Sequence, residues 1–205
     1  MQPRHILITI LAALCVLGAY WYFSRAEAVR NYPSNGTDII AFGDSLVEGV
    51  GASQGGDFVS LLSRKIGQPI INLGRSGDTT QDGLARLNAL DAYRPKVVLL
   101  LLGGNDYLRR IPEAQTFENL GRMIGDMQRR GAIVILLGVR GGILSDHFDS
   151  RFERMSEEYK TAYVSDVLDG LLGRDAYMSD EIHPNDVGYR LIAERIYPVL
   201  LPLLK

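Results

Sequence analysis

The sequence predicts a three-layer α/β domain, in which helices cover both faces of a parallel sheet. Short apolar runs bounded by turn-forming residues alternate with segments whose apolar residues recur at helical spacing. One run, residues 97–102, has six apolar residues in succession, which is typical of a central strand buried on both faces. Strands that alternate with helices in this way form parallel sheets joined by right-handed crossovers.

The expected elements follow one another without an internal repeat. Four strands are predicted: the first ends at Gly43, and the others span residues 69–73, 97–102 and 133–137. Apolar spacing predicts helices over residues 58–66, 84–93, 117–131, 148–163 and 187–204. Pro198 predicts a kink or an early end of the last helix. Residues 164–178 have room for a short fifth strand and a short helix.

An apolar segment precedes the expected domain. Residues 6–23 carry no charge and are long enough for a membrane anchor, and the aromatic residues at 20–23 resemble an interfacial belt. A cleaved signal peptide is the alternative, with a small-residue site at 26–28. Either interpretation sends the remainder of the chain across a membrane. The chain therefore divides into an anchor or signal segment, a linker and a folded domain, at residues 1–25, 26–36 and 37–205.

Composition excludes several classes of function. Cys15 is the only cysteine of the 205-residue chain and lies in the apolar segment, so the domain has no disulfide, no cysteine-based metal site and no catalytic cysteine. The chain has 22 Lys and Arg residues, three of them before residue 31, and 24 Asp and Glu residues, one of them before residue 31. Residues 31–205 therefore carry 19 basic and 23 acidic residues and have a net charge of −4. Without a basic run, no nucleic-acid partner is expected.

Conspicuous loops follow three of the predicted strands. They span residues 43–45, 72–77 and 103–106, and a fourth block of polar residues lies at 180–184, just before the last helix. Because parallel strands direct their carboxyl ends to one edge of the sheet, where open α/β sheets bind ligands, these loops are expected to converge.

Ser45 and His183 are the candidate nucleophile and base. Serine is a poor nucleophile unless a base takes its proton, and the base works best when a carboxylate fixes its tautomer. His183 is the one histidine near the expected crevice, since His5 flanks the apolar segment and His147 lies in a charged loop. Asp180, three residues before His183, can reach the imidazole Nδ1 within one turn of chain.

A negative charge that develops on a carbonyl oxygen needs hydrogen-bond donors. The candidates are the backbone N–H groups of Ser45 and Gly74 and the side-chain amide of Asn105. Each residue also has a structural explanation: Gly74 suits a turn, Asn105 a loop cap, and Asp180 a cap of the turn before His183. All of these residues are expected at the same edge of the sheet, which favours a catalytic role over the separate structural explanations. Asp180 and His183 lack further ligands for a metal site, so no metal is expected.

A second serine lies in a G-x-S-x-G pattern at residues 51–55. That motif requires a strand before it and a helix directly after it. Residues 47–50 are too short and too rich in glycine to form a new strand after Ser45. We therefore favour Ser45 over Ser53 as the nucleophile.

The four blocks resemble those of the SGNH (GDSL) hydrolase superfamily, and residues 76–87 are similar to the bacterial thioesterase I/lysophospholipase/arylesterase branch. The resemblance covers residues 37–204 and implies a flavodoxin-like α/β/α sandwich with about five parallel strands and no cofactor. It implies a set of catalytic residues: Ser45 as nucleophile, Gly74 and Asn105 as oxyanion donors, and Asp180 with His183 completing the triad.

The resemblance further implies a serine ester hydrolase for small acyl esters, thioesters or lysophospholipids. A carbohydrate O-acetylesterase and a membrane-tethered binding module without activity are the alternatives. We expect a monomer at the bacterial inner membrane facing the periplasm, or a periplasmic or secreted protein after cleavage. Segment 139–178, where this branch shapes its acyl pocket, matches poorly, so no preference for acyl-chain length is predicted.

Overall fold

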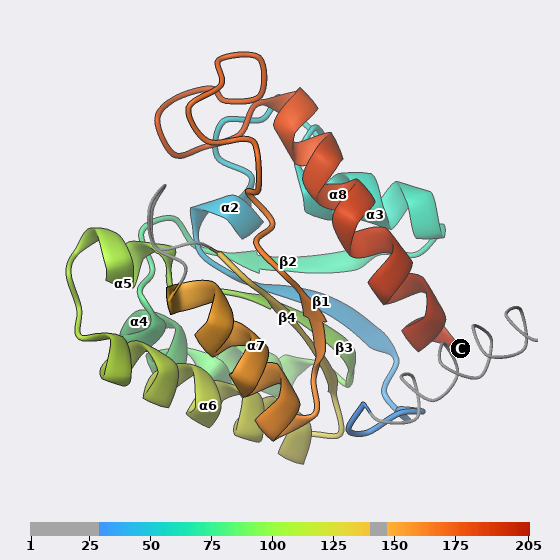
Figure 1. The fold of residues 1–205 in the computed structure, drawn as a ribbon. Helices are drawn as coiled ribbons and strands as arrows, with labels where there is room; N and C mark the ends of the chain where they lie inside the picture. The colour runs from blue at the N-terminus through green and yellow to red at the C-terminus, as the bar shows by residue number, and fades with distance from the viewer. Residues whose placement is uncertain (1–28, 140–146) are drawn as a thin grey trace, which may run out of the picture.

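The computed structural model describes residues 29–139 and 147–205. Five parallel strands form one sheet in the order β2-β1-β3-β4-β5, which is the order of flavodoxin-like domains (Figure 1). The strands are β1 (Asp38–Gly43), β2 (Ile70–Gly74), β3 (Pro95–Leu101), β4 (Ile133–Leu137) and β5 (Ala162–Val164). The predicted fold class and the parallel sheet are confirmed.

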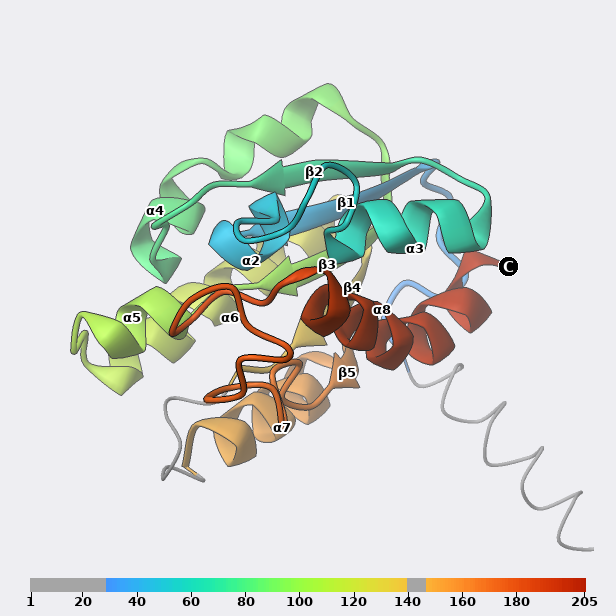
Figure 2. The same ribbon diagram turned by 90° about the horizontal axis from the view of Figure 1, so that it is seen from above.

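Helices cover both faces of the sheet. On one face α3 packs against α8, and on the other α6 packs against α4 and α7 (Figure 1). Two short helices, α2 and α5, lie where the strands end (Figure 2). The α-helices are α2 (Ser45–Glu48), α3 (Phe58–Ile66), α4 (Thr80–Ala85), α5 (Gly104–Leu108), α6 (Glu113–Arg129), α7 (His147–Tyr159) and α8 (Asp186–Leu200).

The apolar run at 97–102 forms the middle of the core. Its residues are completely buried, and β3 lies between β1 and β4 as a central strand. The strand β4 is buried along its whole length. A continuous apolar run therefore identified the strands that are covered on both faces.

The helix predicted at 148–163 is too long. α7 ends at Tyr159, because Lys160 takes a left-handed conformation with φ of +53°, and such a residue terminates a helix. The chain then enters β5, which has three residues and pairs with β4. Residues 165–178 contain turns instead of the short helix that we considered.

Two other helices differ from expectation. The segment predicted as one helix at 84–93 belongs to α4 and to a separate 3₁₀ helix, η1 (Leu87–Ala92). Pro198 does not end α8, which continues to Leu200 and is followed by a second 3₁₀ helix, η2 (Leu201–Leu204).

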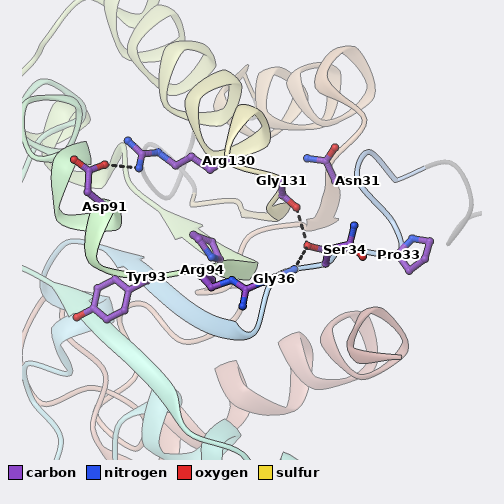
Figure 3. A pocket seen from close by; sticks show the side chains of 11 residues that line it. Asn31, Pro33, Ser34, Gly36, Asp91, Tyr93, Arg94, Arg130 and Gly131 are labelled. Carbon is purple, nitrogen blue, oxygen red and sulfur yellow. Dashed lines mark hydrogen bonds and ion pairs between the residues drawn. The ribbon is translucent and has the colours of Figure 1, made fainter.

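The described part of the predicted linker is bound to the domain. Asn31 Nδ2 donates to the carbonyl oxygens of Gln128 and Ala132 at 2.8 and 2.9 Å, and Ser34 Oγ donates to Gly131 at 2.7 Å (Figure 3). These contacts lie beside the start of β4. The predicted anchor or signal segment, 1–25, is outside the described residues, and no described helix is long and apolar enough to span a membrane.

Candidate active site

Ser45 lies at the carboxyl edge of the sheet, where β1 ends. It is the first residue of α2, and the Asp44 carboxylate caps this helix by accepting the Leu46 N–H at 3.0 Å. A side chain at Gly43 would collide with the Leu101 carbonyl, so glycine allows β1 to turn this close to β3. The strand, the glycine and the cap together fix the position of the serine hydroxyl.

The structure brings the three predicted residues Ser45, His183 and Asp180 into one hydrogen-bonded chain. His183 Nε2 is 3.1 Å from Ser45 Oγ, and His183 Nδ1 is 2.7 Å from Asp180 Oδ2. The other oxygen of Asp180 accepts the backbone N–H groups of Ile182 and His183 at 2.8 and 2.7 Å. Asp180 therefore holds both the imidazole and the turn that carries it.

Asp180 is ionised at every pH at which the protein would be assayed. The hydrogen bond from His183, with a smaller contribution from the Ile182 N–H, lowers the pKa of its carboxyl to about 2. An ionised carboxylate only accepts hydrogen bonds, so Nδ1 of the neutral imidazole carries the proton. The lone pair of Nε2 then faces the hydroxyl of Ser45, as a general base requires.

The loop between α2 and α3 supports the histidine. Gly51 has φ of +92°, and a side chain there would collide with Ser179 Oγ and the Pro184 carbonyl. The Tyr189 hydroxyl donates to the Val50 carbonyl at 2.7 Å. The backbone of this loop is thus packed directly against the turn of His183.

Ser53 has a structural partner. Its hydroxyl donates to Asp186 Oδ2 at 2.5 Å and its backbone N–H donates to Asp186 Oδ1 at 2.7 Å. These bonds join the loop to the first turn of α8. The G-x-S-x-G pattern lies in a loop. Its serine, Ser53, is hydrogen-bonded to a carboxylate, whereas Ser45 lies within hydrogen-bond distance of an imidazole.

Asp44 is a buried carboxyl group beside the candidate nucleophile. Its side chain is 4% exposed, and this burial raises its pKa to about 7, although the Leu46 N–H and the nearby His183 act in the opposite direction. The carboxyl next to Ser45 therefore titrates near neutral pH.

Asn105 lies at the same edge, in α5 after β3. Its side-chain amide donates one N–H to the Asp78 carbonyl at 2.9 Å, which ties α5 to the loop after β2. An amide has two N–H groups, so one remains to bind a substrate oxygen.

The predicted role of Gly74 needs correction. Its N–H already donates to the side-chain oxygen of Asn72 at 2.8 Å. A side chain at Gly74 would collide with the backbone of Glu48, so glycine is needed there for the close approach of β2 to α2. The Gly74 N–H is engaged within β2 and is not available as an oxyanion donor.

Gly77 is the residue of this loop that the sequence reasoning passed over. Its backbone is left-handed, with φ of +82°, and its carbonyl accepts Arg109 Nη2 at 2.8 Å. It directly precedes Asp78, the residue whose carbonyl binds Asn105. The signal was present in the sequence, since Gly77 is the second glycine of the loop at 72–77.

A polar cavity of about 560 Å³ lies at the opposite edge of the sheet (Figure 3). It contains Ser34 and Arg94, and Arg130 reaches across it to Asp91. Arg130 is also paired with Asp126. The cavity has no serine–histidine pair among its lining residues, so the candidate site remains at the carboxyl edge. Within residues 29–139 and 147–205, no group of three or more His, Cys, Asp or Glu residues could hold a metal ion.

Comparison with known proteins agrees with this geometry. The model of the GDSL-like lipase/acylhydrolase family matches residues 41–191, from β1 to α8. The chain belongs to this family. As a GDSL-like acylhydrolase it contains the predicted SGNH hydrolase blocks, and it is a hydrolytic enzyme.

Two curated relatives are similar to the chain over most of their length. Esterase TesA of Pseudomonas aeruginosa is 34% identical over 178 residues, which cover 81% of this chain and 89% of that protein. Thioesterase 1/protease 1/lysophospholipase L1 of Escherichia coli is 30% identical over 81% of this chain and 84% of its own.

Solved structures show the same fold. The crystal structure of TesA matches with a TM-score of 0.76 and 32% identity, over 82% of this chain and 99% of that one. The psychrotrophic esterase EstA from Pseudoalteromonas, inhibited by monoethylphosphonate, matches with a TM-score of 0.73 and 30% identity. The match covers 82% of this chain and 98% of that one.

Proposed function

We propose that the protein is a serine esterase that hydrolyses acyl esters and thioesters through Ser45, His183 and Asp180. The observation that carries this proposal is the chain of hydrogen bonds from Asp180 through His183 to Ser45, with 3.1 Å between Nε2 and Oγ. This distance lies within the reach over which a general base takes a proton.

In the first half of the reaction, Ser45 Oγ attacks the acyl carbonyl carbon and its proton passes to His183 Nε2. The carbonyl electrons move to the oxygen and form a tetrahedral oxyanion. When the intermediate collapses, the bond to the alcohol or thiol breaks, and the leaving group takes the proton from His183. The acyl group is then bound to Ser45 as an ester.

In the second half, water attacks this ester and gives a proton to His183 Nε2. Collapse of the second intermediate breaks the bond to Ser45 Oγ, which recovers the proton from His183, and the carboxylic acid leaves. Asp180 stays ionised throughout and stabilises the imidazolium.

The oxyanion needs donors at the edge where β1, β2 and β3 end. The Ser45 N–H and the second amide N–H of Asn105 are suited to this role, and the Gly77 N–H replaces that of Gly74. Support for Gly77 comes from its left-handed backbone and from the bond between Asn105 and the neighbouring Asp78 carbonyl. Loss of one such donor costs about 10²–10³ in rate.

Apolar side chains near the site support an acyl substrate. Tyr107 and Leu108 follow Asn105 in α5 and are 42% and 55% exposed, and Ile182, next to His183, is 41% exposed. The names of the relatives, esterase, thioesterase and lysophospholipase, support small acyl esters, thioesters and lysophospholipids as substrates. Membrane attachment through residues 1–25, a periplasmic domain and a monomeric state remain part of this proposal.

The test is kcat/KM of the full-length protein on p-nitrophenyl esters from acetyl to palmitoyl. We expect Ser45→Ala to lower kcat by about 10⁶-fold, and the matched control Ser53→Ala to keep the wild-type value. A fluorophosphonate should label Ser45, with loss of fluoride, as a phosphonate inhibits the relative EstA. Activity that survives in Ser45→Ala would refute the triad. A wild type that cleaves only acetylated sugars would instead indicate a carbohydrate O-acetylesterase, and one that is never labelled would indicate a binding module.

A further inference from the structure

Arg86 lies directly after α4 and extends beneath the candidate site. Its side chain is 18% exposed, and its guanidinium lies over the ring of Phe42, 4.1 Å from the ring centroid. Phe42 is completely buried in β1. A cation held over the face of a fixed aromatic ring is attracted to that ring, which helps to fix its position.

From this position the guanidinium joins three segments. Nη2 donates to the Gly43 carbonyl at 2.8 Å, Nη1 donates to the Leu73 carbonyl at 3.0 Å, and Nε donates to the Asp78 carboxylate at 2.5 Å. Gly43 is two residues before Ser45, Leu73 is the penultimate residue of β2, and Asp78 belongs to the loop of residues 74–79. One side chain therefore links the strand of the nucleophile to the loop of the oxyanion donor.

Other contacts hold this loop to the short helices at the same edge. The Arg75 N–H donates to the Gly43 carbonyl at 3.0 Å, which therefore accepts from two arginines. The Ser76 N–H donates to the Glu48 carboxylate at the end of α2. These two bonds join the loop to β1 and to α2, whereas Arg86, directly after α4, binds the Asp78 side chain.

Another arginine, Arg195, also binds two backbone carbonyls, but its role is purely structural. Arg195 in α8 donates from Nη1 and Nη2 to the carbonyls of Val167 and Asp169, both at 2.6 Å. Arg195 joins α8 to the turns after β5, whereas the carbonyls bound by Arg86 belong to the segments that carry Ser45 and Gly77.

We propose that Arg86 is a positioning residue of the hydrolase, which sets the distance between the Ser45 hydroxyl and the Gly77 N–H, the oxyanion donor of loop 74–79. This role rests on the proposed serine esterase mechanism. Arg86 acts through the backbone and touches no substrate atom. Its loss should lower kcat, since the oxyanion forms after binding, and should leave KM nearly unchanged.

Arginine is the residue suited to this position. Its planar guanidinium offers several N–H donors in fixed directions, whereas a lysine ammonium is a compact charge that cannot bind three spread acceptors with the same geometry. Without Arg86, the Asp78 side chain, which is 6% exposed, would have as its ion-pair partner the exposed Arg75, 3.8 Å away. The loop would then move to hydrate that carboxylate.

The experiment compares full-length Arg86→Met, Arg86→Lys, Arg86→Ala and the matched control Arg195→Met. We measure kcat and KM on a p-nitrophenyl ester, the rate of fluorophosphonate labelling, the melting temperature and amide hydrogen exchange at residues 74–79. Arg86→Met should lower kcat by about 10²-fold, which is typical of a small displacement of catalytic groups. It should also speed exchange in the loop. Arg86→Lys should recover part of kcat, and added guanidinium should recover part of it in Arg86→Ala.

Arg195→Met should lower the melting temperature and keep the wild-type kcat and the wild-type exchange at 74–79. The proposal is overturned if the Arg86 variants keep wild-type kcat, or if kcat falls equally in Arg195→Met. If Arg86→Met does not fold, the kcat and the loop exchange of Arg86→Lys decide in the same way. A wild type that is inert and unlabelled would overturn the proposed function, and this role with it.

Discussion

Two carboxyl groups near Ser45 have pKa values displaced in opposite directions. Asp180 has a half-exposed side chain and accepts three hydrogen bonds, which hold its pKa at about 2. Asp44 is buried and accepts one backbone N–H, and the cost of a buried charge raises its pKa to about 7. The environment therefore gives the two aspartates different charges over the acidic range.

The displaced pKa of Asp44 predicts a pH dependence of stability. The folded protein holds this proton up to about pH 7, whereas the unfolded chain releases it near 3.8, so the free energy of unfolding should fall as the pH rises between these values. Asp44→Asn cannot titrate and should lose this part of the slope. Denaturant titrations from pH 4 to pH 8 measure it.

The matched control for Asp44→Asn is Asp57→Asn, since Asp57 caps α3 by accepting the Ser60 N–H at 2.8 Å. This variant removes a carboxylate from a helix cap but leaves Asp44 in place. If the two variants flatten the stability profile to the same extent, the pH dependence does not come from Asp44.

The meeting of Ser45, Asp180 and His183 could be predicted from the sequence, whereas the choice between Gly74 and Gly77 as the candidate oxyanion donor was made wrongly, although both glycines were visible in the loop at 72–77. Ser45 and His183 stand out by their place after a strand and by the elimination of other histidines. Gly74 was chosen as a glycine at the end of β2, but its N–H is taken by Asn72, two residues earlier. A hydrogen bond between a backbone N–H and a side chain two residues earlier produces no periodic pattern in the sequence.

At the scale of elements, α4 connects the sheet to the site. Gly83 in this helix is packed so closely that an added Cβ would lie 2.5 Å from Leu102 Cδ1 and 3.3 Å from Met123 Sδ. Leu102 and Met123 are completely buried, so either side chain would have to move within the packed core. The position of α4, and of Arg86 after it, depends on the absence of a side chain at Gly83.

Gly83→Ala should therefore destabilise the protein by about 1–3 kcal/mol, as overpacking of a core does, although alanine favours a helix by about 1 kcal/mol. It should also lower kcat, because α4 would shift with Arg86. Gly125→Ala in α6 is the control, since an added Cβ there meets only the flexible end of Arg129 at 3.5 Å. That variant should be slightly more stable than the wild type in the same denaturant titrations. Destabilisation of both to the same degree would contradict the packing argument.

Element boundaries were harder to predict than element types. The run at 97–102 identified β3 because a strand buried on both faces is apolar throughout. The boundary between α7 and β5 was missed, because β5 has three residues and Lys160 is not a residue type that signals a left-handed helix end. Tertiary pairing with β4 defines that strand, and local sequence does not.

At the scale of the whole molecule, the two edges of the sheet have separate roles. Ser45, Asn105 and the loop of Gly77 follow the carboxyl ends of the strands, whereas residues 29–36 bind beside the start of β4. The six residues of β1 separate the two edges by roughly 20 Å at about 3.3 Å per residue. Residues 29–36 therefore bind the domain far from the candidate active site.

This separation predicts that stability and activity respond differently to changes at Asn31. Asn31→Ala removes two hydrogen bonds to backbone carbonyls and places alanine in a left-handed conformation, with φ of +67°. The free energy of unfolding should fall by about 2 kcal/mol, while kcat/KM per folded molecule should equal that of the wild type. Asn35→Ala, at an exposed position of the same segment, should change neither quantity. A loss of kcat/KM in Asn31→Ala would mean that the amino edge acts on Ser45 through the sheet, because no described contact of Asn31 reaches the catalytic loops directly.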